Sequence, residues 1–519
     1  MKKLPIGIQT FENLILEGYS YVDKTPYIKQ MTSQGKYYFL SRPRRFGKSL
    51  LLSTIKAAYQ GKKDLFQGLY LQENWDWNSV HPVVHISFGS GVLRDIQELR
   101  TTFDEILYDH RIEHEIKYSK TSLKGRFSEL IFNLSEKYDQ KVVILVDEYD
   151  KPILDNVENR DTAADIREEL KNYYSVIKDA DPYIEFVLIT GVSKFSKVSL
   201  FSGLNNLEDI TLDKTFSAMC GYTQNELETV FAGYLEGVDL AQVKLWYNGY
   251  NWLGQEVYNP FDILLYLKSK EFSNYWFETG TPSFLIKLLH SRKYAIPSLE
   301  SIKASEKLMG SFDLDMIEIE TLLFQTGYLT IKAVQQTAGL RRFNLGYPNL
   351  EVKQSLADSL LTYLTGTLAE SENAKFSAFD ALLSNDLDSL GDIFHAFFAS
   401  IPHDWYRKNQ LAGYEGYYAS IVYCYFAALG LDVQAEEATN KGRLDLCIRF
   451  EGRIYILEFK VVELTGQGKP LDQIKNRGYA EKFTGQEIYL IGVEFSSQDR
   501  NVVSFEWEKV SSDKDTSWV

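Results

Sequence analysis

The chain contains 519 residues and carries a formal net charge of −15 at pH 7. Because this length exceeds what a single hydrophobic core organises, we expect roughly three domains. The acidic balance argues against a protein that coats nucleic acid through bulk charge, so any such contact has to come from local basic patches.

The positions of the cysteines and the lengths of the apolar segments indicate the cellular compartment in which the protein works. Cys220, Cys424 and Cys447 are far apart and form no paired framework, which favours a reducing environment and predicts a cytoplasmic protein. The N-terminus reaches polar residues before an apolar segment forms, which is not typical of a signal peptide. No apolar run approaches the roughly 18–20 residues of a membrane span, so no membrane partner is predicted.

A phosphate-binding loop is predicted after the aromatic run at 37–40. The segment 41–49, SRPRRFGKS, precedes apolar residues at helical spacing, which indicates strand, loop and helix. Backbone N–H groups of such a loop cradle phosphate, while Lys48 contacts the β/γ-phosphates and Ser49 ligates Mg²⁺. Arg42 occupies the place of the first motif glycine, and the alternative is a basic turn before an ordinary helix. The residues predicted to bind nucleotide here are Arg44, Arg45, Phe46, Gly47, Lys48, Ser49 and Leu50.

A second strand-like run, at 141–146, ends in Asp147 and Glu148. Its unbroken aliphatic sequence suits a strand buried on both faces of a parallel sheet, and open α/β sheets place their chemistry at the carboxyl ends of such strands. We predict that Asp147 holds Mg²⁺ and that Glu148 polarises the attacking water. The alternative is that Asp147 only caps the next segment.

A further buried strand, at 184–193, places Thr190 or Ser193 where a hydroxyl senses the γ-phosphate. Strands that alternate with helices predict an α/β fold with a doubly wound parallel sheet, as in P-loop NTPases. The cofactors predicted for this domain are ATP and Mg²⁺.

The middle of the chain, 216–375, is predicted to be a mostly helical lid or linker. Its aromatic cluster at 246–252 contains no interleaved basic residues, so we expect these rings to pack against the nucleotide domain rather than to stack on bases.

The sequence at 110–114 fits the zinc-binding pattern H-x-x-E-H, with His110 and His114 on one helical face and Glu113 between them. No third ligand is evident on this polar helix. We therefore expect a solvated charged face instead of a metal site.

The C-terminal part is predicted to form a helix up to Gly430, strands at about 431–438, 443–450 and 453–461, a helix, and strands near 487–494 and 501–510. A two-residue turn at 451–452 sets Asp445 directly opposite Glu458, with Lys460 on the same face. Asp445 and Glu458 are predicted to hold Mg²⁺, and Lys460 to stabilise charge during phosphodiester hydrolysis. The alternatives are a simple cross-strand ion pair, or a bulged turn that breaks the alignment.

Two resemblances follow from these residues. The blocks at 39–49, 146–152, 190–196 and 201–207 resemble the bacterial AAA-ATPase-like family, whose members carry a C-terminal PD-(D/E)XK nuclease module and commonly have the RPRRF form of the loop. The pattern Asp445…Glu458-Phe459-Lys460 resembles the signature of that nuclease superfamily. The resemblance implies that Glu415 is a further metal ligand and that Gln473 is a catalytic residue that positions water or nucleic acid.

The expected organisation is a nucleotide-binding domain at 1–215, a helical region at 216–375 and a PD-(D/E)XK nuclease-like domain at 376–519. The function favoured is an ATP-binding and ATP-hydrolysing protein with a Mg²⁺-dependent nuclease, in bacterial defence or mobile-element control. By resemblance the partner is nucleic acid, DNA in preference to RNA, and a homo-oligomer is left open. The alternative is a nucleotide-dependent switch or scaffold that binds nucleic acid or protein without cleaving; a translocase motor is disfavoured because helicase motifs are not recognisable.

Overall fold

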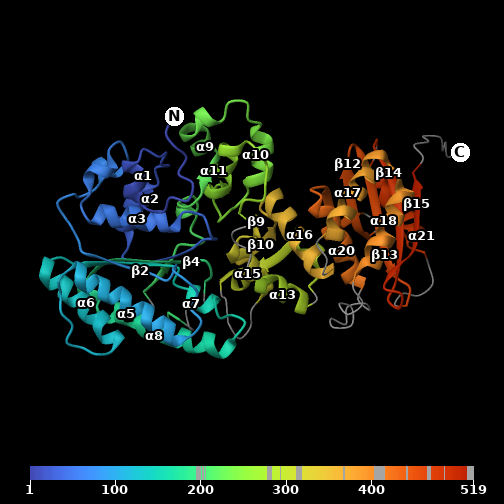
Figure 1. The fold of residues 1–519 in the computed structure, drawn as a ribbon. Coiled ribbons are helices and arrows are strands. Elements are labelled where there is room, and N and C mark those ends of the chain that lie inside the picture. The colour runs from blue at the N-terminus through green and yellow to red at the C-terminus, as the bar shows by residue number, and fades with distance from the viewer. Residues whose placement is uncertain are drawn as a thin grey trace. The chain divides into compact units, whose positions relative to one another are not determined.

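The computed structural model describes residues 1–194, 200–201, 204, 206–276, 283–292, 294–310, 318–365, 369–401, 415–439, 442–463, 469–483 and 485–510. The chain divides into two compact units, which are drawn in Figure 1. The first combines Met1–Gly280 with Lys303–Asn349, and the second combines Thr281–Ile302 with Leu350–Val519. The segment 216–375 therefore contributes to both units, and the boundaries expected near 215 and 375 stay predictions.

The first unit contains the predicted parallel sheet, in which every pair of neighbouring strands is parallel. Strand β4 lies between β1 and β3, so the phosphate loop after β1 and the carboxylates after β3 flank the end of β4. Strands β1 and β3 are buried along their whole length, as their apolar sequences require. The strands in spatial order are β2 (Val83–Ser87), β3 (Val142–Asp147), β4 (Ile184–Gly191), β1 (Tyr37–Ser41) and β5 (Glu208–Asp209).

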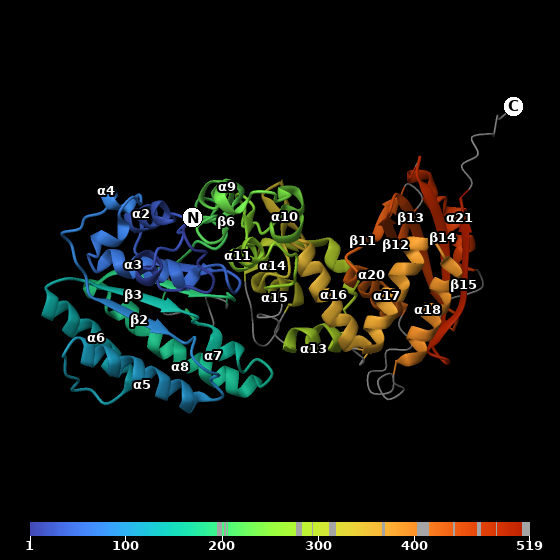
Figure 2. The same cartoon turned by 45° about the horizontal axis from the view of Figure 1, so that its top comes forward.

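Helices cover both faces of this sheet, with α5, α6 and α8 on one side and α3 on the other (Figures 1 and 2). Helix α5 begins where the Asp95 carboxylate accepts two backbone N–H groups, and its apolar residues at i, i+4 and i+8 face the sheet. The α-helices described in this unit are α1 (Phe11–Leu16), α2 (Thr25–Gln34), α3 (Lys48–Tyr59), α4 (Leu71–Asn74), α5 (Ile96–Glu113), α6 (Leu123–Tyr138), α7 (Lys151–Leu154), α8 (Arg160–Asp179), α9 (Gln224–Val230), α10 (Leu240–Tyr247), α11 (Pro260–Ser269), α14 (Glu306–Gly310) and α15 (Ile319–Thr326).

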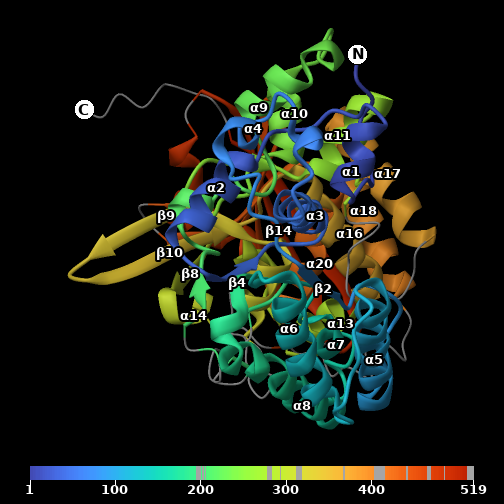
Figure 3. The same cartoon turned by 90° about the vertical axis from the view of Figure 1, so that its left-hand side faces the viewer.

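The middle region is mostly helical, as predicted, but it also contains small sheets that the sequence pattern did not indicate. Strands β6 (Tyr222–Thr223) and β7 (Val257–Tyr258) pair with each other, and β8 (Ile302–Ser305), β10 (Leu340–Gly346) and β9 (Thr330–Thr337) form a second sheet. The hairpin of β9 and β10 projects outward in Figure 3. The aromatic cluster at 246–252 packs as expected, because Tyr250 and Trp252 both contact Phe46 of the phosphate loop.

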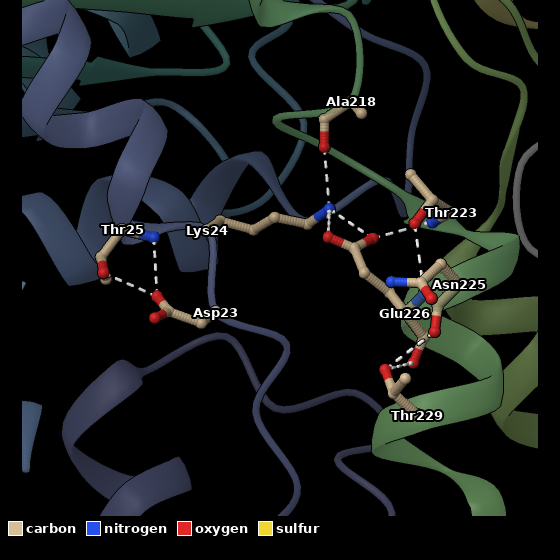
Figure 4. Close-up of polar contacts among 8 residues, drawn as sticks. All are labelled: Asp23, Lys24, Thr25, Ala218, Thr223, Asn225, Glu226 and Thr229. Carbon is tan, nitrogen blue, oxygen red and sulfur yellow. Dashed lines mark hydrogen bonds and ion pairs between the residues drawn. The ribbon is translucent and has the colours of Figure 1, made fainter. Parts of the chain in front are cut away.

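Lys24 joins the N-terminal segment to the start of α9, as Figure 4 shows. Its Nζ donates to the Ala218 carbonyl at 2.8 Å and to both carboxylate oxygens of Glu226, at 2.6 and 2.7 Å. The same carboxylate accepts the Thr223 N–H at 2.8 Å and so completes a capping box at the helix start. Burial lowers the pKa of Lys24, and the carboxylate opposes this by favouring the charged form. The pair therefore fixes the chain segment that leads into the phosphate loop.

The second unit contains a sheet in the order β11-β12-β13-β14-β15, in which only the β13 and β14 pair is parallel. Each observed strand overlaps its predicted range. The elements described here are α13 (Ser283–Ser291), α16 (Leu350–Thr365), α17 (Ala369–Ser384), α18 (Leu387–Ser400), α20 (Glu415–Ala428), β11 (Asp432–Thr439), β12 (Gly442–Phe450), β13 (Arg453–Val461), α21 (Pro470–Arg477), β14 (Glu487–Ser496) and β15 (Asn501–Lys509).

The hairpin of β12 and β13 has the predicted register. Phe450 pairs with Arg453 across a two-residue turn, and the pairing runs in single steps to Leu446 and Leu457. Glu451 and Gly452 have φ values of +49° and +74°, the left-handed conformations that a type I′ turn demands of both residues.

Helix α21 packs on one face of this sheet because Gly492 of β14 leaves room for it. A Cβ at Gly492 would lie 2.5 Å from the backbone nitrogen of Leu471, which is closer than packed atoms approach. Alternate residues Ile454 and Ile456 of β13 share a core with α21, so residue 458 points toward the same helix. Among the described residues, no helix has both the length and the apolar character that a membrane span requires.

Candidate nucleotide site and candidate nuclease site

The phosphate loop connects β1 directly to α3, as predicted. Gly47 precedes the helix with φ +91°, and no atom lies within 4 Å of where its Cβ would be, so the loop leaves open space at the helix start. Lys48 is buried and its Nζ donates to the carbonyl groups of Arg42 at 2.8 Å and Pro43 at 2.9 Å. Burial lowers the pKa of Lys48, and the Asp147 carboxylate is the first of the groups that oppose this.

The structure brings Ser49, Asp147 and Thr190 together at the ends of β1, β3 and β4. Ser49 Oγ donates to Asp147 Oδ2 at 2.5 Å, and Thr190 Oγ1 donates to Asp147 Oδ1 at 2.8 Å. Asp147 is buried, and its carboxylate is held by one hydroxyl group from the first turn of α3 and one from β4. A hydroxyl beside a fixed carboxylate is the ligand pair that Mg²⁺ takes in phosphate-loop proteins.

Ser193 is placed differently from Thr190. Its Oγ donates to Asp150 Oδ2 at 2.6 Å, and the same carboxylate oxygen accepts the Ser193 N–H at 2.6 Å. Asp150 is buried and thus anchors the turn after β4. The sequence analysis did not predict this role of Asp150. Its position three residues after Asp147 was the available signal.

Glu148 follows directly after β3 and lines the cavity at the phosphate loop, and its predicted role in polarising water stays a prediction. It has φ +52°, and a Cβ at Gly89 would lie 3.4 Å from its Oε2, so the carboxylate faces the end of β2. Burial raises the pKa of Glu148, the negative charge of Asp147 adds to the rise, and the charges of Lys48 and Arg44 oppose it.

A cavity of about 390 Å³ opens beside the phosphate loop. The volume lies within the range of about 300–1,000 Å³ of small-molecule sites. Glu148 and all seven loop residues predicted to bind nucleotide line it, whereas Asp147 and Thr190 lie behind this surface. The remaining walls come from segments that the sequence did not indicate, namely 5–9, 20–24, 219–222 and 260–264, with isolated residues beside them. The cavity, the open loop at Gly47 and the Ser49–Asp147 pair fit a nucleoside triphosphate with Mg²⁺.

Arg42 has a structural task that explains why it replaces the motif glycine. Its guanidinium is fully buried and donates to the carbonyl groups of Ser41 at 2.8 Å and Thr211 at 2.9 Å, and it lies 4.2 Å from the ring centre of Trp252. Burial lowers the pKa of Arg42 to about 10. Arg42 therefore ties the loop to the segments that follow β5.

We expect Arg42→Ala to lower the free energy of unfolding by about 3 kcal/mol or more, because buried carbonyl groups each cost about 1–3 kcal/mol when they lose their donor. Chemical denaturation monitored by tryptophan fluorescence measures this loss. The control is Arg45→Ala, whose exposed guanidinium stacks on Phe261 and contributes about 0.5–1 kcal/mol. Equal losses in the two variants would contradict the anchoring role of Arg42.

The candidate nuclease site lies on β12 and β13. The pairing of the two strands extends to Leu446 and Leu457, and Asp445, the preceding residue of β12, accepts the Phe459 N–H through Oδ2 at 2.9 Å. Lys460 lies two residues beyond Glu458 and therefore on the same face, half-buried, while Phe459 packs against Phe495 on the other face. Glu458 and Lys460 thus share one face, and the joint role predicted for them with Asp445 stays a prediction.

Glu458 is the most unusual group of this site because a carboxylate is buried here with 3% exposure. Gln473 of α21 donates through Nε2 to Glu458 Oε1, whereas Oε2 is buried and has no hydrogen-bond partner among the described residues. Burial raises the pKa of Glu458 to about 8, with the charge of Asp445 as the second cause. An unpaired carboxylate oxygen beside a second carboxylate fits a divalent cation.

Gln473 is therefore positioned as predicted, on the helix that covers the carboxylates. Glu415 begins α20, but its side chain lies outside the described part of the structure, so its predicted role as a metal ligand stays a prediction.

Glu458 makes stability depend on pH in a defined direction. A carboxyl group whose pKa rises from 4.5 to about 8 on folding holds a proton that the unfolded chain has released, so stability falls as pH rises through this interval. Without divalent ions, we expect the unfolding temperature to be lower at about pH 9 than at about pH 6. The raised pKa contributes about 1.4 kcal/mol to the free energy of unfolding for each pKa unit, and Glu458→Gln should lack this pH dependence. Scans of both proteins across this range measure it, and superimposable pH profiles would contradict the assignment.

Known proteins match both units. Residues 5–201 match a family model described as predicted AAA-ATPase, and residues 413–505 match one described as PD-(D/E)XK nuclease superfamily. A protein of Azotobacter chroococcum mcd 1, described as an uncharacterized protein in the vnfD 5' region, is 52% identical over 508 residues. The alignment covers 97% of this chain and 98% of the relative. The two matched ranges contain the two candidate sites.

Proposed function

Because the chain belongs to the family that joins a predicted AAA-ATPase domain to a PD-(D/E)XK nuclease superfamily domain, we propose that it binds and hydrolyses ATP and cleaves nucleic-acid phosphodiester bonds. The buried carboxylate of Glu458, with one unpaired oxygen beside Asp445, is the observation that carries the nuclease assignment. A purely structural hairpin gains nothing from such a group, because burying a carboxyl oxygen without a hydrogen-bond partner costs free energy.

In the nucleotide half, the loop at 44–50 binds the phosphates of ATP through its backbone N–H groups and Lys48. Mg²⁺, when bound, neutralises the charge that develops on the phosphates. Ser49 and Asp147 hold the ion, and Thr190 keeps the Asp147 carboxylate in place. Glu148, with its raised pKa, accepts a proton from the attacking water.

In the nuclease half, Asp445 and Glu458 hold Mg²⁺, which supplies a polarised water and charge stabilisation at the scissile phosphate. Gln473 orients the Glu458 carboxylate, and Lys460 stabilises the charge that develops on the phosphate oxygens. The exposed side chains of Lys475 and Arg477, on the helix that carries Gln473, contact the phosphate backbone.

The substrate proposed is DNA in preference to RNA, in bacterial defence or the control of mobile elements, with nucleotide binding as the input that controls cleavage. The nuclease superfamily supports nucleic acid as the substrate class, and the acidic net charge makes its contact depend on local basic side chains.

The test is to incubate the purified full-length chain with single- and double-stranded DNA and RNA, in Mg²⁺ or Mn²⁺, with and without ATP. We expect metal-dependent cleavage of DNA that responds to ATP. Binding without cleavage under every condition would replace the nuclease by a nucleotide-dependent switch or scaffold.

A further inference from the structure

A cluster of two histidines and a glutamate lies at the C-terminal end of α5, away from the residues assigned above. The sequence suggested a solvated charged face here, but this expectation is wrong for the histidines. His110 and His114 are 6% and 9% exposed, because the last turn of α5 packs beside β2 and α6. Only Glu113 reaches solvent, with 51% of its side chain exposed.

The three side chains converge on one point. His110 Nδ1 lies 3.5 Å and His114 Nε2 lies 3.9 Å from Glu113 Oε2, and all three ligand atoms lie within 4.8 Å of one another. A tetrahedral ion with bonds of about 2.0–2.2 Å sets its ligand atoms about 3.3 Å apart, so small side-chain rotations complete the geometry. Both ring nitrogens are buried and have no hydrogen-bond partner among the described residues.

The opposite ring nitrogens have the partners that metal-bound imidazoles use. His110 Nε2 lies 3.1 Å from the His85 carbonyl, and His114 Nδ1 lies 2.9 Å from the Tyr138 hydroxyl. A proton on each of these nitrogens leaves His110 Nδ1 and His114 Nε2 with free lone pairs directed toward Glu113. In the competing tautomer, His110 Nε2 accepts the His85 N–H at 3.2 Å instead.

The surroundings of the cluster keep both imidazoles neutral and contain charges of both signs. Burial lowers the pKa of both imidazoles, so they are neutral at neutral pH, as ligands must be. The Glu113 carboxylate favours a cation here, whereas the charges of Lys137 and Lys56 oppose one, and Lys137 Nζ donates to the His114 carbonyl at 2.6 Å.

We propose that His110, Glu113 and His114 bind one Zn²⁺ ion at the end of α5, with water in the fourth position. Imidazole nitrogens select zinc over the magnesium that the carboxylate sites take. The site is independent of the proposed ATPase and nuclease activities.

The experiment uses the metal-stripped full-length protein, titrated with Zn²⁺ while excess Mg²⁺ occupies the oxygen-ligand sites. We expect one Zn²⁺ per chain, a rise in unfolding temperature, and a visible absorption band when Co²⁺ replaces Zn²⁺. Glu113→Gln and His114→Gln should each weaken Zn²⁺ binding at least about tenfold. The matched control is Glu105→Gln, an exposed carboxylate on the same helix, which should bind as the wild type does.

Glu113→Gln changes an exposed side chain and leaves the two buried histidine rings in place. A loss of Zn²⁺ binding in this variant is therefore not explained by misfolding. If the wild type binds no Zn²⁺, or if both variants bind it as tightly as the wild type, the cluster is a hydrogen-bonded polar group in the competing tautomer and the metal site is refuted.

Discussion

Lys48→Ala is expected to weaken ATP binding at least about 30-fold, because removing one partner of a buried charge contact costs about 2–5 kcal/mol. Arg44 and Arg45 also line the cavity, but their side chains are exposed, whereas Lys48 is buried at the start of α3. Isothermal titration calorimetry with ATP in the presence of Mg²⁺ measures the loss of ATP affinity.

Two further variants separate binding from folding. Lys48→Met keeps the buried aliphatic volume and should also lose ATP, with the unfolding temperature less affected than in Lys48→Ala. Lys62→Ala removes a lysine that pairs with Glu12 outside the cavity lining and should leave affinity unchanged. Unchanged ATP affinity in both Lys48 variants would remove the phosphate-loop assignment.

The elements that the sequence predicted best are those specified by local pattern. The buried run before Asp147 and the Gly47-Lys48-Ser49 turn fix a strand end and a helix start without help from distant residues. The Glu451-Gly452 turn likewise determines the register of β12 and β13, because two-residue loops with left-handed conformations join strands without a bulge.

The features that escaped prediction depend on contacts between distant residues. Arg42 looked like a defect in the motif, and its role became evident only with the carbonyl group of Thr211 and the ring of Trp252. Lys24 gave no signal at all, since its partner Glu226 is 202 residues away. Helical periodicity placed His110 and His114 on one face, but burial of that face depends on β2 and α6, which no local pattern reports.

Lys460→Ala is expected to reduce cleavage of nucleic acid by about 10²–10³-fold, because its ammonium stabilises charge that appears only in the transition state. Binding of the same nucleic acid should fall much less, because the surrounding lysines and arginines supply the sequence-independent attraction to phosphate. Cleavage rates at saturating substrate, measured beside a binding isotherm in Ca²⁺, separate the two effects.

The control for charge is Lys509→Ala, on the edge strand β15, where the lysine pairs with Glu487. It changes net charge by the same amount, so its cleavage rate should match the wild type if the effect of Lys460 is local. Glu458→Gln should lose cleavage as completely as Lys460→Ala, since a neutral amide cannot supply the anionic ligand that a metal ion requires. Cleavage that survives in both site variants would place the chemistry elsewhere in the chain, because Asp445 alone cannot supply two carboxylate ligands on this face.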